Sequence, residues 1–584
     1  MIRINQIKIS IFEVGTDAEK ETRLLKKLSA GLLSCRQDDI RKLKLVRRSI
    51  DAREKDNIEF VYTVDVRLHD SVVGPSAETE LRFVEKLKNA NIRQMNKAPL
   101  TLPIPKETGN AFGGTTDGTG DGTGDGIGDD GAGIKKAPIV VGSGPCGLFA
   151  AYVLAECGRT PIILERGEDV DKRTAKTEIF FESGKLDPDC NIQFGEGGAG
   201  TFSDGKLNTS IKDRGGYIEF VLKTFVRFGA DPEILIDQKP HVGTDVLTTV
   251  VKNMREYIIS KGGRYVFNAR FDDLTARDGH ISSVSYTDTH TGNTQTLECS
   301  ELILATGHSA RDTFLMLKNK DFDMEAKPFA VGVRIQHPQE LIDKALYGAD
   351  RLSEKQAILG PAAYKLTRKA LNGRNCFSFC MCPGGYVVNS SSEDGRLCVN
   401  GMSYNDRASG TANSALIVNV TPEDFADATG SDDILNGMEF QRQLEEQAYK
   451  LCDGVIPYET YKEFRENSKA PEGTSSYEAK FLGYAAAADV RGALPDYVGD
   501  AIADCMAGFA RTIEGYDSDD AIIAGVEART SSPVRILRDD NTREAIGFAG
   551  VYPAGEGAGY AGGITSAAAD GVKTALRILG VTEL

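Results

Sequence analysis

The sequence lacks the features that would place the protein in a membrane or on a nucleic acid. No apolar run approaches the roughly 18 residues that a membrane-spanning helix needs, and the longest candidate, residues 481–490, is short and rich in alanine. Basic residues (69 Lys and Arg) are fewer than acidic ones (85 Asp and Glu), and the formal net charge is −16. Because nucleic acids and anionic membranes select basic surfaces, we expect no nucleic-acid partner and no membrane insertion.

The sequence also has no tryptophan and no C-x-x-C pair. Its 11 cysteines are an odd number at scattered positions, which is typical of free thiols in a reducing compartment, so we expect a cytoplasmic protein. Cys376, Cys380 and Cys382 cluster and Cys398 follows, but their spacing matches neither a zinc knuckle nor the dithiol of a flavin-linked disulfide reductase. We therefore expect no metal site and favour buried thiols, while a redox role for the cluster stays open.

Glycine is the residue that the sequence has in excess. There are 62 glycines, whereas the usual share of about 7% corresponds to about 41. Residues 109–133 contain 11 of them, with five aspartates and no lysine or arginine. Such a segment cannot bury enough apolar surface to offset its chain entropy, which predicts a flexible linker. The sequence then divides into residues 1–107, 108–134 (the linker), 135–325, 326–515 and 516–584.

The first part, residues 1–107, has the pattern of a small α+β module. Apolar residues alternate strictly over 60–68, which predicts a strand with one face on a core. Leu24, Leu28 and Leu32 recur every four residues, with Leu25 on the same side, and predict a helix with one apolar face. The expected order β-α-β-β-α suggests a ferredoxin-like half-sandwich. Scaffolding and the docking of a partner protein are both open as its role.

A dinucleotide-binding fingerprint follows the linker. A short apolar strand at 137–141 leads into Gly142-Ser143-Gly144-Pro145-Cys146-Gly147 and then into a helix at 148–157. The first glycine allows the tight turn, the second lets the backbone approach a pyrophosphate, and the third permits close helix–strand packing. The helix N-terminus supplies free N–H groups and the positive end of its dipole to the phosphates.

The second strand of the fingerprint, at 161–164, ends at Glu165-Arg166. A carboxylate at this position can accept hydrogen bonds from ribose hydroxyls. A glycine-dense loop follows at 194–208, where small residues let backbone N–H groups crowd a flat ring system. A mobile surface loop is the alternative interpretation of this segment.

Three later segments favour FAD over NAD by resemblance. Residues 302–307 (Leu-Ile-Leu-Ala-Thr-Gly) resemble the strand and turn that flavoproteins of the glutathione-reductase superfamily place near the cofactor. Residues 550–557 resemble their closing motif, in which an acidic residue binds the ribityl chain; Glu556 stands where many members have Asp. Residues 561–564 open a final helix whose dipole favours negative charge on a reduced flavin.

A more specific resemblance emerges from the set of motifs at 194–207, 305–312, 380–385 and 529–535. Together they resemble the FAD-dependent, or NAD(FAD)-utilising, dehydrogenases, over essentially residues 1–104 and 135–584. This resemblance implies FAD and oxidoreductase chemistry and leaves the substrate open. The cofactor-binding residues predicted in these ways are Gly142, Ser143, Gly144, Pro145, Cys146, Gly147, Glu165, Arg166, Gly198, Ala199, Gly200, Thr201, Ser203, Asp204, Lys206, Asn208, Gly307, Gly555, Glu556, Gly562, Gly563 and Ile564.

The predicted fold class is α/β, with a Rossmann-like FAD-binding domain formed by residues 135–325 and 516–584. An α+β substrate domain at 326–515 interrupts it. Residues 210–520 show no second strand–glycine–helix unit, so we expect no separate NAD(P)H domain. Two reductants stay open: NAD(P)H that binds transiently, and another substrate.

Four residues are candidates for catalysis. His308 follows the Ala-Thr-Gly turn and is a candidate proton shuttle. Arg334 and His337 are candidates to clamp an anionic substrate, and Arg529 to line the substrate side; a purely structural role is the alternative for each. The predicted function is hydride exchange between FAD and a small organic substrate. A flavin-binding redox sensor or scaffold that docks a partner protein is the alternative.

Overall fold

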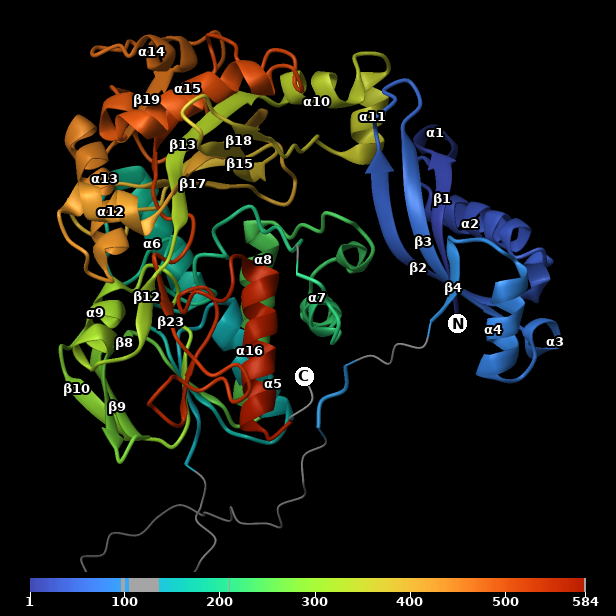
Figure 1. Cartoon of the computed structure of the whole chain (residues 1–584), viewed down its shortest axis with the longest axis horizontal. Coiled ribbons are helices and arrows are strands. Elements are labelled where there is room, and N and C mark those ends of the chain that lie inside the picture. The colour runs from blue at the N-terminus through green and yellow to red at the C-terminus, as the bar shows by residue number, and fades with distance from the viewer. Residues whose placement is uncertain (96–99, 104–135, 210, 582–584) are drawn as a thin grey trace, which may run out of the picture.

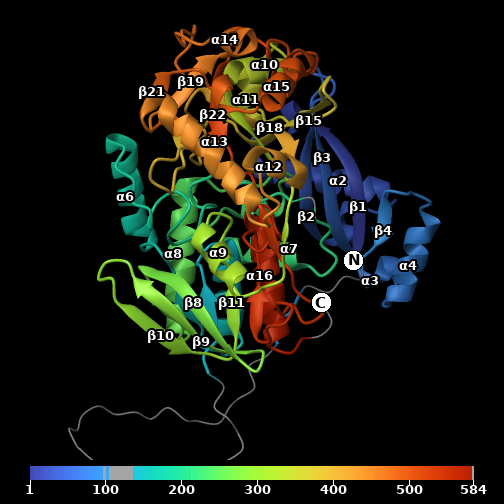
Figure 2. The same ribbon diagram turned by 60° about the vertical axis from the view of Figure 1, so that its left-hand side comes forward.

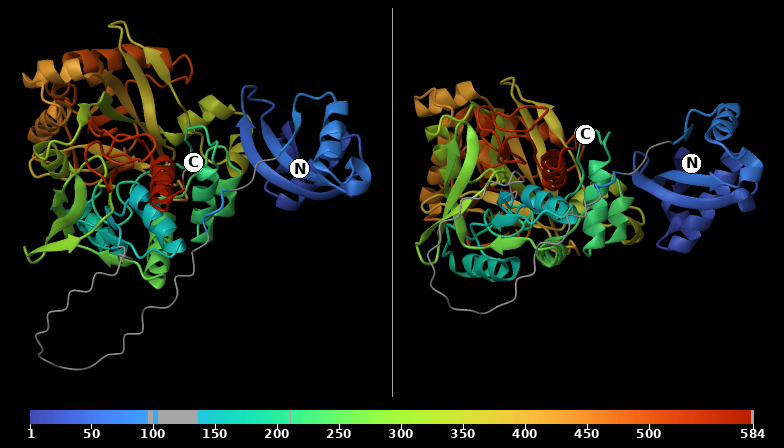
Figure 3. Two further views of the ribbon diagram at one scale, coloured as in Figure 1. Left: turned by 60° about the horizontal axis from the view of Figure 1, so that its bottom comes forward. Right: turned by 90° about the horizontal axis from the view of Figure 1, so that it is seen from below.

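The computed structural model describes residues 1–95, 100–103, 136–209 and 211–581. The predicted linker at 108–134 lies outside the described residues. The N-terminal part, up to residue 95, stands beside a larger body formed by the rest of the described chain (Figure 1). Two further views show that this N-terminal part projects from one side of the larger body (Figure 3).

The N-terminal part is built on a four-stranded antiparallel sheet in the order β2-β3-β1-β4. The predicted alternation over 60–68 is confirmed, because every second side chain from Phe60 to Leu68 is buried. Its elements are β1 (Ile2–Ser10), α1 (Ile11–Val14), α2 (Ala18–Leu32), η1 (Gln37–Asp39), β2 (Ile40–Asp51), β3 (Glu59–Leu68), α3 (Asp70–Val73), α4 (Ala77–Lys86) and β4 (Ile92–Gln94).

The predicted face of α2 is confirmed only in its first part. Leu25 is buried and Leu24 is partly buried against the core, whereas Leu28 and Leu32 are 37% and 39% exposed. The buried stripe includes Glu21, whose carboxylate accepts a 2.7 Å hydrogen bond from the hydroxyl of Tyr62 on β3. The prediction was wrong for Leu28 and Leu32, because Ser29 and Ala30 form the buried side of the helix after Leu25.

The larger body contains a five-stranded parallel sheet in the order β24-β11-β5-β6-β7. In chain order this is the 3-2-1-4-5 arrangement of a Rossmann-type fold, with the first strand in the centre. The two segments that were predicted to form the FAD-binding domain both contribute to this sheet. The strands are β5 (Ile139–Val141), β6 (Ile162–Leu164), β7 (Arg264–Val266), β11 (Leu302–Leu304) and β24 (Val551–Pro553).

Both faces of the parallel sheet are covered. Val140, Ile163 and Ile303 pack on helices. Leu302 and Leu304, on either side of Ile303, pack on a three-stranded antiparallel sheet. Strands with two buried faces are continuous apolar runs in the sequence, which is why the strands of this sheet could be predicted. The covering elements are α5 (Pro145–Glu156), α7 (Tyr217–Arg227), α8 (Thr244–Ser260) and α16 (Ile564–Ile578) on one face, and β8 (Ala269–Arg277), β9 (His280–Asp288) and β10 (Thr294–Glu298) on the other.

A seven-stranded sheet forms the core of the region after residue 326 and lies above the parallel sheet in Figures 1 and 2. Its order is β14-β15-β18-β13-β22-β19-β21. The strand β22 (Ile522–Glu527) pairs antiparallel with β13 in this sheet, so the predicted boundary between 515 and 516 cuts through it. The other strands are β13 (Phe329–Pro338), β14 (Thr367–Lys369), β15 (Asn375–Cys382), β18 (Thr411–Val420), β19 (Ile456–Thr460) and β21 (Ala485–Ala487).

The chain passes between the two large sheets twice, and the two passages pair as β12 (Met324–Ala326) and β23 (Val534–Ile536). Another small sheet has the order β17-β16-β20, with β16 (Tyr386–Asn389), β17 (Val399–Met402) and β20 (Phe481–Leu482). None of the helices in the described part of the chain combines the length and apolarity needed to cross a membrane. The remaining elements are α6 (Val170–Ser183), η2 (Pro232–Leu235), α9 (Arg311–Asn319), α10 (Gln339–Tyr347), α11 (Leu352–Leu359), α12 (Pro422–Thr429), α13 (Asn436–Cys452), α14 (Tyr461–Glu466), η3 (Arg491–Ala493) and α15 (Asp496–Phe509).

A buried carboxyl in the seven-stranded sheet makes the stability depend on pH. Glu459 on β19 is fully buried, and burial raises its pKa from 4.5 to about 8. Its Oε1 accepts a 2.8 Å hydrogen bond from the Arg491 amide, but Oε2 has no hydrogen-bond partner among the described residues. Since the unfolded chain ionises at a lower pH than the folded one, folding loses free energy as pH rises from about 4.5 to about 8.

We expect Glu459→Gln to be more stable than the wild type at pH 8, by on the order of 2 kcal/mol, and nearly equal to it at pH 5. Glutamine keeps the acceptor for the Arg491 amide and removes the ionisation. Chemical unfolding at both pH values measures the difference. Glu466→Gln is the control, because the Glu466 side chain is 57% exposed. A gain for Glu459→Gln of the same size at pH 5 would contradict this explanation.

Candidate functional site

One cavity of about 1230 Å³ runs between the N-terminal part, the carboxyl ends of the parallel strands and the seven-stranded sheet. Gly144 and Gly198 line it from the parallel-sheet side, Cys380 from the seven-stranded sheet, and Arg48 from the N-terminal part. Its volume exceeds the 300–1,000 Å³ that is usual for a ligand pocket, which leaves room for a large cofactor and a second small molecule. Open α/β sheets bind ligands at this edge of the sheet.

The fingerprint glycines have the geometry of a dinucleotide cradle. Gly142 has φ +95°, and a Cβ there would lie 2.4 Å from the Ala305 carbonyl oxygen. A Cβ on Gly147 would lie 1.9 Å from the Gly142 carbonyl oxygen, so only glycine allows this turn to pack on its helix. Gly144 is the N-cap of α5 and makes no side-chain cap, so the first amides of the helix are left for an anion.

The second wall of the cradle is the loop at Gly198. A Cβ built on Gly144 would lie 3.6 Å from the Gly198 Cα, an ordinary contact distance, and both residues line the cavity. The missing side chains of Gly144 and Gly198 therefore leave space at the helix N-terminus. A pyrophosphate group fits this combination of space, backbone amides and dipole.

Glu165 accepts four hydrogen bonds. Ser143 donates from its amide (2.9 Å) and its hydroxyl (2.6 Å) to Oε2, and the amides of Gly167 (3.1 Å) and Gly195 (2.9 Å) donate to Oε1. A carboxylate has about four acceptor sites, and the Ser143 hydroxyl is the one donor here that can rotate away. A ribose hydroxyl that replaced the Ser143 hydroxyl would donate to a carboxylate that three backbone amides already hold in place.

The glycine-dense loop is held by an arginine that the sequence analysis missed. Arg173 on α6 is fully buried, and its guanidinium donates to five backbone carbonyls of residues 191–198, among them Glu196 (2.7 Å) and Gly198 (2.9 Å). These bonds order the loop opposite α5, and Arg173 forms no ion pair with any other described residue. Arg173 belongs to no motif, so nothing in the sequence identified it.

The structure brings most of the predicted cofactor residues to one place. Ser143, Gly147, Thr201, Asp204 and Gly555 do not line the cavity but lie in the loops that do; the Gly555 amide, for example, donates to Asp570 (2.8 Å). The predicted residues that line the cavity are Gly142, Gly144, Pro145, Cys146, Glu165, Arg166, Gly198, Ala199, Gly200, Ser203, Lys206, Asn208, Gly307, Glu556, Gly562, Gly563 and Ile564.

Two of the four catalytic candidates lie away from the cavity, which corrects that part of the prediction. Arg334 and His337 are on β13, a central strand with both faces buried. Arg334 pairs with Glu527 (2.6 Å) and donates to the side chain of Asn413 (2.8 Å), and His337 Nε2 lies 2.8 Å from the Tyr516 carbonyl oxygen. Neither residue lines the cavity, so neither can clamp a substrate there directly.

His308 and Arg529 do line the cavity. The Nδ1 of His308 lies 3.0 Å from the Ser309 hydroxyl, and burial together with Arg529 and Arg311 lowers the pKa of the imidazole to about 4. The ring is neutral at pH 7, so it can form hydrogen bonds but is a weak proton acceptor.

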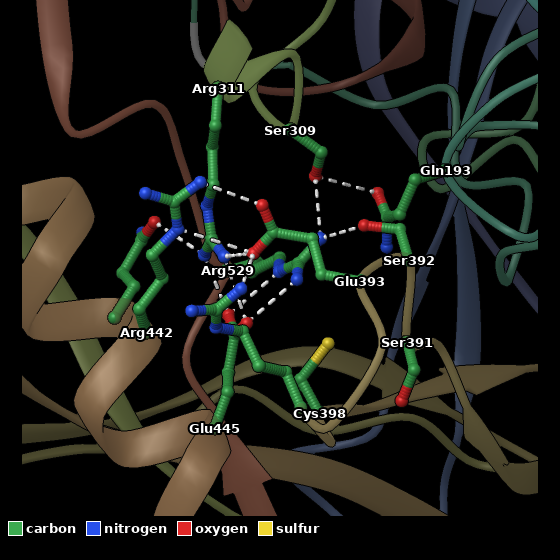
Figure 4. A network of polar contacts seen from close by, with 12 residues as sticks. Gln193, Ser309, Arg311, Ser391, Ser392, Glu393, Cys398, Arg442, Glu445 and Arg529 are labelled. Carbon is green, nitrogen blue, oxygen red and sulfur yellow. Dashed lines mark hydrogen bonds and ion pairs between the residues drawn. The ribbon is translucent and has the colours of Figure 1, made fainter. Parts of the chain in front are cut away.

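Arg529 belongs to a buried ion network that joins the two large sheets (Figure 4). Its guanidinium forms two 2.7 Å bonds with the carboxylate of Glu445 on α13. Arg311 at the start of α9 donates to the same carboxylate at 2.7 and 3.0 Å. Glu445 thereby fixes two cations, of which Arg529 lines the cavity, and their charge holds its pKa at about 2 against the effect of burial.

Two carboxyl groups of the cavity have pKa values near neutrality. Burial raises the pKa of Glu556 to about 7, although Lys327 opposes the shift. Burial also raises the pKa of Glu527 to about 6, and its ion pair with Arg334 limits the rise. Groups with such values can gain or lose a proton at physiological pH. Glu527 was not predicted, since it ends the apolar strand β22 and lies just before the motif at 529–535.

The fold and the cavity define a Rossmann-type dinucleotide-binding protein with a second large sheet over the site. Residues 328–530 match the family model described as "FAD-dependent protein, C-terminal domain-like", and this match supports FAD as the cofactor. Residues 1–67 match a domain of unknown function, DUF8436.

An uncharacterised protein of Clostridium beijerinckii is 41% identical to this chain over 594 aligned positions, which cover 99% of this chain and 98% of that protein. The chain belongs to the same family as this clostridial protein. Among solved structures, a flavoprotein/dehydrogenase from Cytophaga hutchinsonii aligns at 12% identity over 77% of this chain and 80% of that one, with a TM-score of 0.32. The E. coli quinol fumarate reductase FrdA aligns at 11% identity over 77% and 69%, with a TM-score of 0.33.

Proposed function

We propose that the protein is an FAD-dependent oxidoreductase that acts on a small organic substrate, with NAD(P)H as a transient reductant. Residues 135–325 and the segment after β22 would hold the cofactor, the N-terminal part would be a ferredoxin-like module, and the inserted seven-stranded sheet would supply the substrate side. FAD, when bound, supplies two-electron hydride exchange. Gly144 and Gly198 would hold its pyrophosphate, and the loops at Gly307 and Gly562 its flavin end.

The observation that carries this proposal is the continuity of the cavity. The cofactor loops and the carboxyls Glu527 and Glu556 open into the same space. A hydride exchange with an organic substrate usually requires a proton to be taken up or released, and a buried carboxyl with a pKa near 7 is suited to hold it. Arg529 and neutral His308 would orient the substrate by hydrogen bonds.

The redox sensor or scaffold remains the second candidate. Arg48 of the N-terminal part pairs with Asp237 (2.9 Å), and Glu21 and Glu233 also contact its guanidinium. These contacts, together with the presence of Arg48 in the cavity wall, favour a role of the N-terminal part in closing the site. A partner protein would have to bind elsewhere on this part.

The test uses the purified full chain. We expect visible flavin absorbance, bleaching of that absorbance under anaerobic conditions by NADH or NADPH, and rapid reoxidation by one class of small-molecule acceptor. A protein that shows no flavin absorbance after reconstitution with FAD would exclude both candidates. Reoxidation by none of the acceptors, with a partner protein retained in only one redox state, would favour the sensor.

Glu556→Gln tests the proton-holding role. Glutamine mimics the protonated acid, so we expect the pH profile of flavin reduction to lose its ionisation near pH 7. The rate should fall by roughly 10²–10⁴-fold at the optimum if the carboxyl transfers the proton. Glu325→Gln is the control, because Glu325 lies outside the cavity and its side chain is 50% exposed. An unchanged profile in Glu556→Gln would assign the proton to another group.

A further inference from the structure

The cysteine cluster that the sequence analysis left open is divided by the structure. Cys376 is buried on β15 beside Cys505 of α15, on the side away from the cavity. Four residues later, Cys380 lines the cavity and is only partly buried. The three neighbouring thiols therefore occupy two different environments.

A β-bulge directs Cys380 into the cavity. Along β15, Phe379 pairs with Ala415 of β18 and Cys382 pairs with Asn413, so one extra residue lies between the two pairs on β15. Cys380 has φ +42°, a left-handed conformation that is uncommon outside glycine. Bulges of this kind turn a side chain out of its regular position and are frequent beside active sites.

Cys382 lies within reach of Cys380. Its Sγ donates a 3.2 Å hydrogen bond to the Cys380 carbonyl oxygen, and the two side chains interact. Arg334 donates to the same carbonyl at 2.9 Å and approaches the Cys382 sulfur at 3.6 Å. The Cys382 side chain, together with the charges of Lys206 and Arg334, keeps the pKa of Cys380 below its ordinary value. Burial raises the pKa of Cys382.

The cavity near these thiols presents two cations beside the carboxyl groups of Glu527 and Glu556, which also interact with Cys380. Lys206 lines it and pairs with buried Asp204 at 2.9 Å. Arg407 also lines it, forms no ion pair within the described part of the chain, and has a buried Nε that lacks a hydrogen-bond partner there. Asp204 interacts with both cations, which places Arg407 in the same cluster. An unpaired guanidinium in a cavity wall is suited to a carboxylate ligand.

We propose that Cys380 and Cys382 form a redox dithiol that reduces an anionic, low-molecular-weight disulfide bound in this cavity. The proposal deepens the proposed function, because the dithiol opens into the cavity assigned to the cofactor. The Cys380 thiolate attacks one sulfur of the substrate, the substrate S–S bond breaks, and the first thiolate leaves. The Cys382 thiol then loses its proton to solvent and attacks the Cys380 sulfur, and the second thiolate leaves. The chain is oxidised by two electrons to a Cys380–Cys382 disulfide, and the substrate is reduced to two thiols.

The test uses the reduced full chain and two disulfide probes, anionic 5,5′-dithiobis(2-nitrobenzoate) and neutral 2,2′-dithiodipyridine. We expect a fast phase that releases two thionitrobenzoate anions per chain and leaves a Cys380–Cys382 disulfide, found by peptide mass spectrometry. Cys382→Ser should release one anion quickly and keep a mixed disulfide on Cys380. Because a thiolate attacks and a thiol does not, the fast phase should be at least about tenfold faster than the other half-buried thiols at pH 7.

Matched variants separate reactivity from exposure. Cys157 and Cys452 are also partly buried but lie outside the cavity, so Cys157→Ser and Cys452→Ser should keep the fast phase. Arg407→Gln should slow the anionic probe about tenfold and leave the neutral probe unchanged. Peptide mapping of the wild type needs no variant and decides the case if Cys380→Ser fails to fold.

A fast phase that maps to another cysteine, or oxidation without a Cys380–Cys382 disulfide, would overturn the proposal. If Arg407→Gln slowed both probes equally, the inference that the substrate is anionic would be overturned. Flavin absorbance of the same samples distinguishes the two proposals. A colourless protein with the fast phase would support the dithiol and exclude the FAD oxidoreductase. A yellow protein without the fast phase would support the FAD-binding protein and exclude the dithiol.

Discussion

Replacement of Glu445 by alanine is expected to lower the free energy of unfolding by about 3–5 kcal/mol, because it leaves the buried guanidinium of Arg529 without a carboxylate and that of Arg311 with Glu393 alone. Glu445 is fully buried, and Arg311 and Arg529 are 2% and 8% exposed. Removing one member of a buried ion network is costly since the remaining charges cannot return to water. Glu445→Gln keeps the size of the side chain, so a loss there as well identifies charge as the cause.

Denaturant unfolding followed by far-UV circular dichroism or by tyrosine fluorescence measures this effect, since the chain has 19 tyrosines and no tryptophan. Glu446→Ala is the matched control on the same helix. Glu446 pairs with Arg396 at 2.7 Å, and its side chain is 38% exposed, so its loss should cost less than about 1 kcal/mol. Equal midpoints for the two variants would show that the network adds no stability.

Gly144→Ala is expected to raise the dissociation constant of FAD by about 10- to 100-fold, which corresponds to the 1–3 kcal/mol typical of overpacking by one methyl group. The new Cβ meets the Gly198 Cα at 3.6 Å, so the protein itself accommodates the methyl group. The group would occupy space beside the free amides of α5, where the pyrophosphate is proposed to bind. Titration of apo-protein with FAD, followed by flavin fluorescence, measures the change.

Substitutions of two other glycines serve as comparisons for Gly144→Ala. Gly31 lies in α2 with nothing within 4 Å of a built Cβ, so Gly31→Ala should leave FAD binding unchanged. In Gly147→Ala the Cβ would collide with the Gly142 carbonyl oxygen, so this variant should lose both stability and FAD. If Gly144→Ala binds FAD as tightly as the wild type, the cofactor does not use this cradle.

The cofactor side of the site was predictable because its signals are local. The glycines at 142–147, the acid at 165 and the turn at 307 each follow a short apolar strand. The parallel order of these strands brings their carboxyl ends to one edge of the sheet. Contiguous sequence therefore carries the strand, the turn and the helix start that a pyrophosphate needs. The strand at 60–68 was predictable for the same reason, because its alternation lies within one short stretch of sequence.

The substrate side was less predictable, because residues far apart in the sequence compose it. Arg334 had the right charge, but it lies in a central strand and pairs with Glu527, 193 residues away. The packing of that strand decided that the arginine is buried, and a bulge in β15 decided that Cys380 faces the cavity. No local pattern encodes such a choice.

The sequence by itself determined the Rossmann-type segment and its dinucleotide cradle, because those features depend on backbone freedom and strand-to-helix order within short stretches. Only the tertiary structure decided which titratable groups meet in the cavity. Burial raises the pKa of Glu556 to about 7 and that of Glu527 to about 6, and a one-residue bulge turns Cys380 toward Lys206. These properties arise from desolvation and from charges on distant segments, so they exist only once the sheets have packed together.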